Sequence, residues 1–267
     1  MKRILGIAAF ASVLASSAFA ADMPVKAMPR IVDPVWSWTG FYVGVNGGYS
    51  WGRSEATVDP TTPLATNIRH NVDGWLGGVQ AGYNWQVNPK FLWGVEADIQ
   101  ATGERGGSTD VLPVLRVPLL GITGTATSNT SFPWFATFRG RAGWLADPSL
   151  LLYATGGLAV GEVKFNTQTT LILQRFDGAN AAIGGPIPFV GATVFDRQTR
   201  VGWTAGAGVE KKFDPRWSVK LEYLYIDLGS ATYFGGTADQ TSVKFHDHVF
   251  RAGVNYEFTA GPVVAKY

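Results

Sequence analysis

The chain has 267 residues and a formal net charge of +2, and only 16% of its residues are charged while 13% are aromatic. Its lysines and arginines are scattered along the sequence rather than clustered, which argues against a nucleic-acid partner. Cysteine is absent, so the fold has neither disulfides nor thiolate metal sites to stabilise it.

The N-terminal segment has the pattern of a cleaved secretory signal peptide. Two cationic residues precede an apolar stretch from Ile4 to Ala15, and the small-x-small triplet Ala18-Phe19-Ala20 follows. This stretch is too short to cross a bilayer as a helix. We therefore expect a signal peptide at 1–20. The segment 21–38 carries three prolines and no periodicity, and we expect it to be a flexible periplasmic linker.

From residue 39 onward, apolar residues alternate with small, polar or charged ones, which is typical of β-strands whose two faces differ. Small residues on both faces make the fifth run the weakest, and its apolar side is assigned to Leu152, Ala154, Leu158 and Val160. The pattern predicts eight strands. The runs cover 41–51, 74–85, 91–100, 134–144, 150–162, 200–210, 217–225 and 250–258.

The connections between these runs alternate between short and long. Tight turns are expected at 87–90, 145–149 and Asp214-Pro215. Outer-membrane barrels have short periplasmic turns and long extracellular loops, with both termini in the periplasm. We therefore expect a barrel over 39–258 and a C-terminal tail at 259–267. The expected extracellular loops lie near 52–72, 102–131, 163–197 and 229–245.

Two of the long connections contain apolar stretches, 111–122 and 183–195. They indicate either strands that continue above the membrane and pack together, or a contact surface for lipopolysaccharide or a partner. Alternation at Thr170, Ile172, Gln174 and Phe176 favours the first interpretation.

Aromatic residues of the apolar faces gather at both ends of the runs, as in the interfacial girdles of a membrane barrel. The predicted girdle residues are Phe41, Trp51, Trp75, Trp85, Trp93, Trp134, Trp144, Trp203, Trp217, Tyr256 and Phe258. A soluble lipocalin-like ligand binder would point the same residues inward, but so many rings would overfill an eight-stranded interior. The sequence thus predicts an all-β, eight-stranded antiparallel up-and-down transmembrane β-barrel in the outer membrane of a Gram-negative bacterium.

The opposite faces of the runs carry nearly balanced charges. We expect a lumenal charge network of Glu96, Asp98, Arg139, Arg141, Arg200, Glu210, Lys220, Glu222, Arg251 and Glu257. Buried charges are tolerated when they are paired, so these residues are expected to plug the lumen. The alternative is a conducting pore whose selectivity they set.

His246 and His248 share one face near the end of the last long connection. Two imidazoles at this spacing are weak candidates for metal binding or for a surface hydrolase. No third ligand is near them in the sequence, and an exposed rim is the favoured interpretation. No cofactor is expected.

Several segments resemble the RopB-type small outer-membrane proteins of alphaproteobacteria, which are porin-like, OmpA-like barrels. The segments are 36–51 (WSWTGFYVGVNGGYSW), 153–159 (YATGGLA), 202–210 (GWTAGAGVE) and 249–256 (VFRAGVNY), and the resemblance spans the mature chain. It implies roles in envelope integrity and surface contact. The family's last strand usually ends in a terminal aromatic that the barrel-assembly machinery reads. Here either Phe258 or Tyr267 fills that role.

We therefore expect a non-enzymatic integral outer-membrane protein that stabilises the envelope and displays surface loops. A narrow, low-conductance porin for small solutes is the alternative, and a surface hydrolase is a third hypothesis. The expected partners are outer-membrane lipid, lipopolysaccharide, the barrel-assembly machinery, and host or cell-surface contacts through the loops.

Overall fold

The computed structural model describes residues 36–58, 67–233 and 241–258. No helix in this part of the chain is long and apolar enough to span a membrane. Its strands are β1 (Gly40–Val58), β2 (Asn67–Asn88), β3 (Phe91–Val117), β4 (Leu120–Asp147), β5 (Leu150–Phe176), β6 (Ala182–Asp214), β7 (Trp217–Tyr233) and β8 (Thr241–Phe258).

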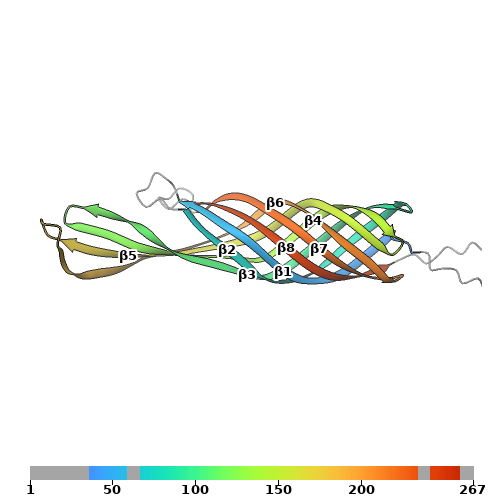
Figure 1. Cartoon of the computed structure of the whole chain (residues 1–267), viewed down its shortest axis with the longest axis horizontal. Coiled ribbons are helices and arrows are strands. Elements are labelled where there is room, and N and C mark those ends of the chain that lie inside the picture. The colour runs from blue at the N-terminus through green and yellow to red at the C-terminus, as the bar shows by residue number, and fades with distance from the viewer. Residues whose placement is uncertain (1–35, 59–66, 234–240, 259–267) are drawn as a thin grey trace, which may run out of the picture. The chain divides into compact units, whose positions relative to one another are not determined.

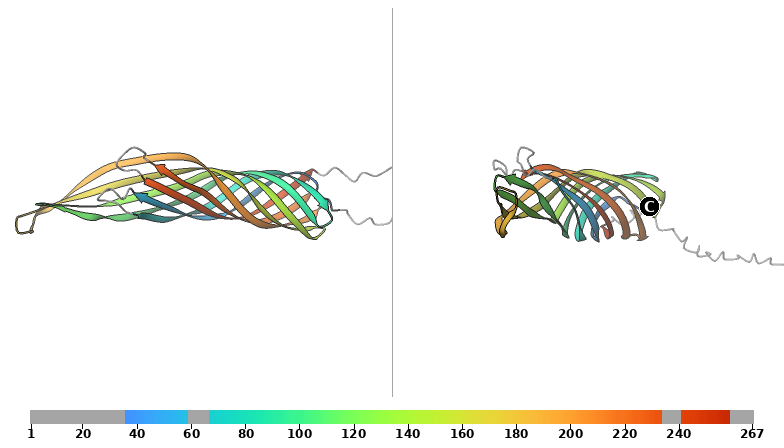
Figure 2. Two further views of the ribbon diagram at one scale, coloured as in Figure 1. Left: turned by 90° about the horizontal axis from the view of Figure 1, so that it is seen from above. Right: turned by 60° about the vertical axis from the view of Figure 1, so that its left-hand side comes forward.

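Each strand pairs antiparallel with the next, and β8 pairs with β1 to close the barrel. All three short turns lie at one end of the barrel and the longer hairpins lead from the other (Figures 1 and 2). We call these the short-turn end and the long-hairpin end. The predicted eight-stranded antiparallel barrel is confirmed.

The alternating sequence pattern sets which side chains face outward. Trp75 and Trp93, on the apolar faces of β2 and β3, are 75% and 61% exposed. Their polar neighbours Gln80 and Glu96 are buried in the lumen. A soluble barrel with an apolar interior would require the opposite arrangement, so the lipocalin-like alternative is wrong.

The strands continue through most of the segments that were expected to be loops. β3 and β4 are joined only at Val117–Leu120, and β5 and β6 at Phe176–Ala182. Beyond Arg105, β3 no longer pairs with β2, and β6 pairs with β7 only from Trp203 onward. We call the resulting sheet, residues 106–131 and 163–202, the four-stranded extension; it leads away from the barrel in Figure 1.

This extension corrects the expectation of loops near 102–131 and 163–197. Its strands carry many threonines and aliphatic residues in alternation, a composition that favours strands. Pairing within the sheet also satisfies the backbone groups of these segments. The other two long connections are likewise shorter than expected, because β1 ends at Val58, β2 begins at Asn67, β7 ends at Tyr233 and β8 begins at Thr241.

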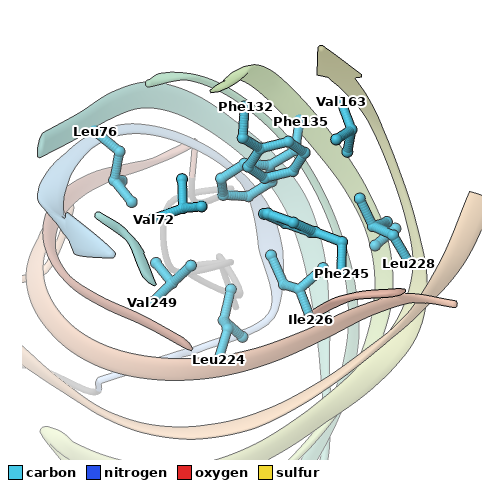
Figure 3. Packing of buried hydrophobic residues seen from close by; sticks show 11 residues of the cluster. Val72, Leu76, Phe132, Phe135, Val163, Leu224, Ile226, Leu228, Phe245 and Val249 are labelled. Atoms are coloured by element: carbon cyan, nitrogen blue, oxygen red, sulfur yellow. The ribbon is translucent and has the colours of Figure 1, made fainter. Parts of the chain in front are cut away.

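The lumen is filled in three levels. An apolar cluster around Trp38 lies at the short-turn end, charged side chains occupy the centre, and a larger apolar cluster lies toward the long-hairpin end. Figure 3 shows the larger cluster, with Phe132, Phe135 and Phe245 pointing inward from β4 and β8. Eight of the ten predicted charged residues therefore occupy the central level of the interior.

Candidate functional site: the barrel lumen

The centre of the lumen holds eight buried charged side chains, which we call the central network. Strand register places opposite charges side by side: Glu96 stands opposite Arg139, Glu210 opposite Lys220, and Glu222 opposite Arg251. Opposite charges at directly opposed positions attract each other. The members are Glu96, Asp98, Arg139, Arg141, Glu210, Lys220, Glu222 and Arg251.

Ion pairs also cross the lumen between strands that are not neighbours. Arg139 on β4 binds Glu222 on β7, with 3.0 Å between Nη1 and Oε1. Arg251 on β8 reaches Asp98 on β3, with 3.0 Å between Nη2 and Oδ2. Lys220 Nζ lies 2.9 Å from Glu96 Oε2. Because these contacts connect opposite walls, the network occupies the space through which a solute would pass.

Two buried tyrosines pack against Arg141 at the side of the network. Its guanidinium lies 4.1 Å from the centroid of the Tyr153 ring and donates to Tyr42 Oη at 2.9 Å. Each ring needs a glycine at the paired position of the neighbouring strand. A Cβ at Gly82 would lie 2.4 Å from Tyr42, and one at Gly208 would lie 2.5 Å from Tyr153. These glycines are therefore the positions that admit aromatic side chains into the narrow lumen.

Trp38 closes the short-turn end of the lumen and is 0% exposed. Its indole Nε1 donates to the carbonyl of Pro148 at 2.9 Å, and Lys212 Nζ lies 4.7 Å from the ring centroid. Lys212 also pairs with Glu257 and donates to the Ser37 carbonyl at 2.6 Å. The expected flexible linker at 21–38 is thus wrong for its last residues, because burial of a large ring holds them in the barrel. Residues 1–35, including the expected signal peptide, lie outside the described part of the chain.

Two carboxyl groups, Glu104 and Asp247, meet inside the lumen at the long-hairpin end. Glu104 packs against Gly74 and Asp247 stands opposite Gly52, so both lie beyond the girdle residues Trp75 and Trp51. Ser50 Oγ donates to Glu104. Burial raises the pKa of Glu104 to about 9 and the pKa of Asp247 to about 7. The two groups are therefore stable together when they hold a proton.

Two members of the predicted charge network lie apart from its centre. Arg200 is buried toward the long-hairpin end, where its Nη2 donates to the Val243 carbonyl at 2.9 Å. Glu257 pairs with Lys212 beneath Trp38 instead of with a central residue. The alternation in the sequence thus shows that a side chain faces the lumen, but it does not show at which level along the barrel axis the side chain finds its partner.

His246 and His248 lie on the outer wall, half-buried, with ring centroids 6.3 Å apart. His248 Nδ1 lies 2.7 Å from the Tyr223 hydroxyl, and its ring stacks on Trp51. The described residues contain no group of three or more side chains suited to hold a metal ion. All eleven predicted girdle residues, by contrast, have outward-facing side chains at positions that are half-buried or exposed.

Sequence reasoning missed Trp38, Glu104, Lys212 and Asp247. Three of them could have been found from the alternation. Each lies an even number of positions from a lumenal residue of its own strand: Glu104 from Glu96, Lys212 from Glu210, and Asp247 from Arg251. Extending the alternation past the girdles would have placed them inside. Trp38 precedes the first strand, so no periodicity could have shown its burial.

Comparison with known proteins shows similarity along nearly the whole chain. It is 34% identical over 268 residues to a 31 kDa outer-membrane immunogenic protein of Brucella melitensis, covering 97% of this chain and 100% of that protein. It is 30% identical over 219 residues to a 22 kDa outer membrane protein of Rhizobium leguminosarum, covering 80% of this chain and 78% of that protein.

Among solved structures, the chain resembles the outer membrane protein OprG of Pseudomonas aeruginosa at 13% identity and a TM-score of 0.42, covering 82% and 97% of the two chains. The predicted resemblance to alphaproteobacterial outer-membrane proteins and the predicted outer-membrane location are confirmed by the sequence relatives. A family model for the outer membrane protein beta-barrel domain matches residues 6–258. The chain therefore belongs to the outer-membrane β-barrel family.

Proposed function

We propose that this protein is a non-enzymatic, plugged barrel that stabilises the outer membrane and displays its long hairpins on the cell surface. The observation that carries the proposal is the central network, whose ion pairs join β3 to β8 and β4 to β7 across the lumen. The apolar cluster and Trp38 add a seal on either side of it. A lumen filled at three levels favours a structural role over solute passage.

The proposed orientation places the short turns in the periplasm and the four-stranded extension outside the cell. It is supported by the general architecture of outer-membrane barrels, in which long connections face outward. Lipid and lipopolysaccharide then surround the barrel. We further propose that the barrel-assembly machinery inserts it, with Phe258 at the end of β8 as the read aromatic, and that the extension makes host or cell-surface contacts.

Planar-bilayer recording tests the plugged lumen. We expect no steady unitary current from the folded wild-type protein, because the ion pairs around Arg139 and Glu222 obstruct the path. Steady currents whose ion selectivity changes in Glu96→Gln, but not in the outward-facing control Lys211→Gln, would refute the plug. They would support the second candidate, a narrow pore, which the buried polar side chains of the central level favour.

The absence of enzymatic activity is tested at His246 and His248, the residues of the hydrolase hypothesis. Their position on the outer wall and the contact of His248 with Tyr223 support a role in the membrane interface. We expect ester and peptide hydrolysis by the purified protein to stay at background. Activity above background that disappears when both histidines are changed to alanine would contradict the proposal.

A further inference from the structure

Three cationic residues stand in one row on the outer wall, at the base of the four-stranded extension. Strand register sets the row: Arg105 on β3 is opposite Ser131, Ser131 is opposite Lys164 on β5, and Lys164 is opposite Arg197 on β6. Arg105 and Arg197 are exposed and Lys164 is half-buried. Like charges directly opposite each other, as in Lys164 and Arg197, are unfavourable unless an anion compensates them.

Arg105 and Lys164 of the row line a groove of about 450 Å³ whose walls include hydrogen-bonding side chains, and Arg197 stands opposite Lys164 on the next strand. Arg105, Lys164 and Ser131 line it together with the amides of Asn129 and Asn166, and the exposed ring of Phe195 forms one side. Guanidinium and ammonium groups bind phosphate, and amides and hydroxyls bind sugar hydroxyls. The groove therefore offers both kinds of contact.

Nearby carboxylates leave the row with excess positive charge. Glu162 pairs with Lys164 at 3.2 Å. Asp73 stands opposite Arg105 but accepts a hydrogen bond from Tyr49. Within the described residues, neither Arg105 nor Arg197 has a carboxylate at ion-pair distance. Both guanidinium groups can therefore bind an external anion, although Asp73 offsets part of the charge of Arg105.

The position of the row identifies the kind of anion. Ser131 lies three residues beyond the girdle residue Trp134 on β4, which is roughly 10 Å or less along a strand. That is the level of lipid headgroups just outside the hydrocarbon region. We propose that this groove binds the phosphate and sugar groups of a phosphorylated outer-leaflet glycolipid. The assignment of the leaflet rests on the proposed orientation.

The opposite wall provides a contrast. Arg53, Arg69 and Lys244 also face outward there, on β1, β2 and β8. Glu55 lies between them and contacts Arg69 at 3.8 Å. Asp73 and Asp227 are close by on the same wall, opposite Trp51 and His246. Each wall carries three cations, but the row has two carboxylates beside it, Glu162 and Asp73, whereas the other wall has Glu55 and Asp227 in addition to its share of Asp73.

Binding of bisphosphorylated lipid A, measured in mixed detergent micelles by microscale thermophoresis, tests the site. We expect Arg105→Gln/Lys164→Gln/Arg197→Gln to weaken binding about tenfold or more, since three charge-assisted contacts are removed. The matched control Arg53→Gln/Arg69→Gln/Lys244→Gln is expected to bind within about twofold of wild type. A heat-dependent gel shift verifies that each variant is folded. If the triple variant does not fold, the single change Arg197→Gln at an exposed position replaces it, and we expect this change to weaken binding severalfold.

Equal losses in both triple variants, or no loss in the first, would overturn the site. Dephosphorylated lipid A that binds as tightly as the bisphosphorylated form would overturn the phosphate contact. Effective competition by millimolar inorganic phosphate or by a sulfated polysaccharide would overturn the assignment to a lipid. Binding in micelles does not depend on which end of the barrel faces outward, so a failure here is distinct from a failure of the proposed orientation.

Discussion

At the scale of single residues, the charges of the lumen act through their partners. Arg139 is completely buried and contacts three carboxylates, those of Glu96, Asp98 and Glu222. Such a buried network gives little net stability over apolar packing, whereas removal of one partner costs about 3–5 kcal/mol because a charge is left unpaired. The network therefore links opposite walls of the barrel, and it obstructs the path.

The carboxyl pair Glu104 and Asp247 predicts an unusual pH dependence. Both pKa values are raised in the folded protein, to about 9 and about 7. The stability that the protonated pair contributes is thus fully present below about pH 4, the range of unfolded carboxyl groups, and is lost as pH rises toward 9. Glu104→Gln should raise the free energy of unfolding at pH 8 by about 1–3 kcal/mol and flatten its pH dependence.

Urea unfolding in lipid vesicles between pH 5 and pH 9 measures this effect. Glu55→Gln, which removes a partly exposed carboxylate on the outer wall, is the control and should follow wild type. A variant at Glu104 that loses stability with rising pH as steeply as wild type would show that the pair does not share a proton.

At the scale of elements, the segment before β1 is part of the barrel. Trp38 packs against Leu92, Leu145, Leu151 and Tyr153, and its backbone N–H donates to Gln86 Oε1 at 3.1 Å. It thereby covers the lumen between the short turns. At the other end, the four-stranded extension also continues past the expected barrel, because pairing between its strands satisfies their backbone groups.

Trp38→Ala should destabilise the short-turn end without abolishing the barrel. Removing a buried tryptophan costs about 3–5 kcal/mol, and the cavity would expose Lys212 and Glu257 to water. Hydrogen exchange near Pro148 and Lys212 should become faster, together with a lower unfolding midpoint. The half-buried neighbour Trp36, changed to alanine, is the matched control. Equal behaviour of the two variants would contradict a specific seal by Trp38.

At the scale of the whole molecule, the two ends of the barrel differ in the length of their connections, and this difference underlies the proposed orientation. The hairpin tip at Asp177–Ala181 is held by its own hydrogen bonds, with Ala181 N donating to Asp177 Oδ1 at 2.8 Å. At the other end, Asn88 Oδ1 accepts from Phe91 N at 2.9 Å across a tight turn. Both tips present an exposed side chain, at Ala179 and Lys90.

Because the chain has no cysteine, single cysteines report orientation directly. A membrane-impermeant maleimide added to intact cells should label Ala179→Cys strongly. Lys90→Cys should be labelled only after the outer membrane is opened, since the periplasm is then accessible. Labelling of Lys90→Cys alone on intact cells would reverse the proposed orientation.

The sequence by itself determined the barrel, the faces of its strands and the outward position of the predicted girdle residues. A period of two is a local property, so the outward position of Trp93 and the lumenal position of Glu96 follow from their immediate neighbours. The same parity, carried further, would have placed Glu104, Lys212 and Asp247 inside the lumen.

Only the tertiary structure decided which lumenal residues meet and what closes each end. Contacts such as Arg251 with Asp98 depend on strand register and barrel closure, which bring residues 153 positions apart to hydrogen-bonding distance. The burial of Trp38 and the row of Arg105, Lys164 and Arg197 likewise arise from segments that are distant in the chain. Alternation specifies a face for each side chain, whereas closure of the sheet specifies its neighbours.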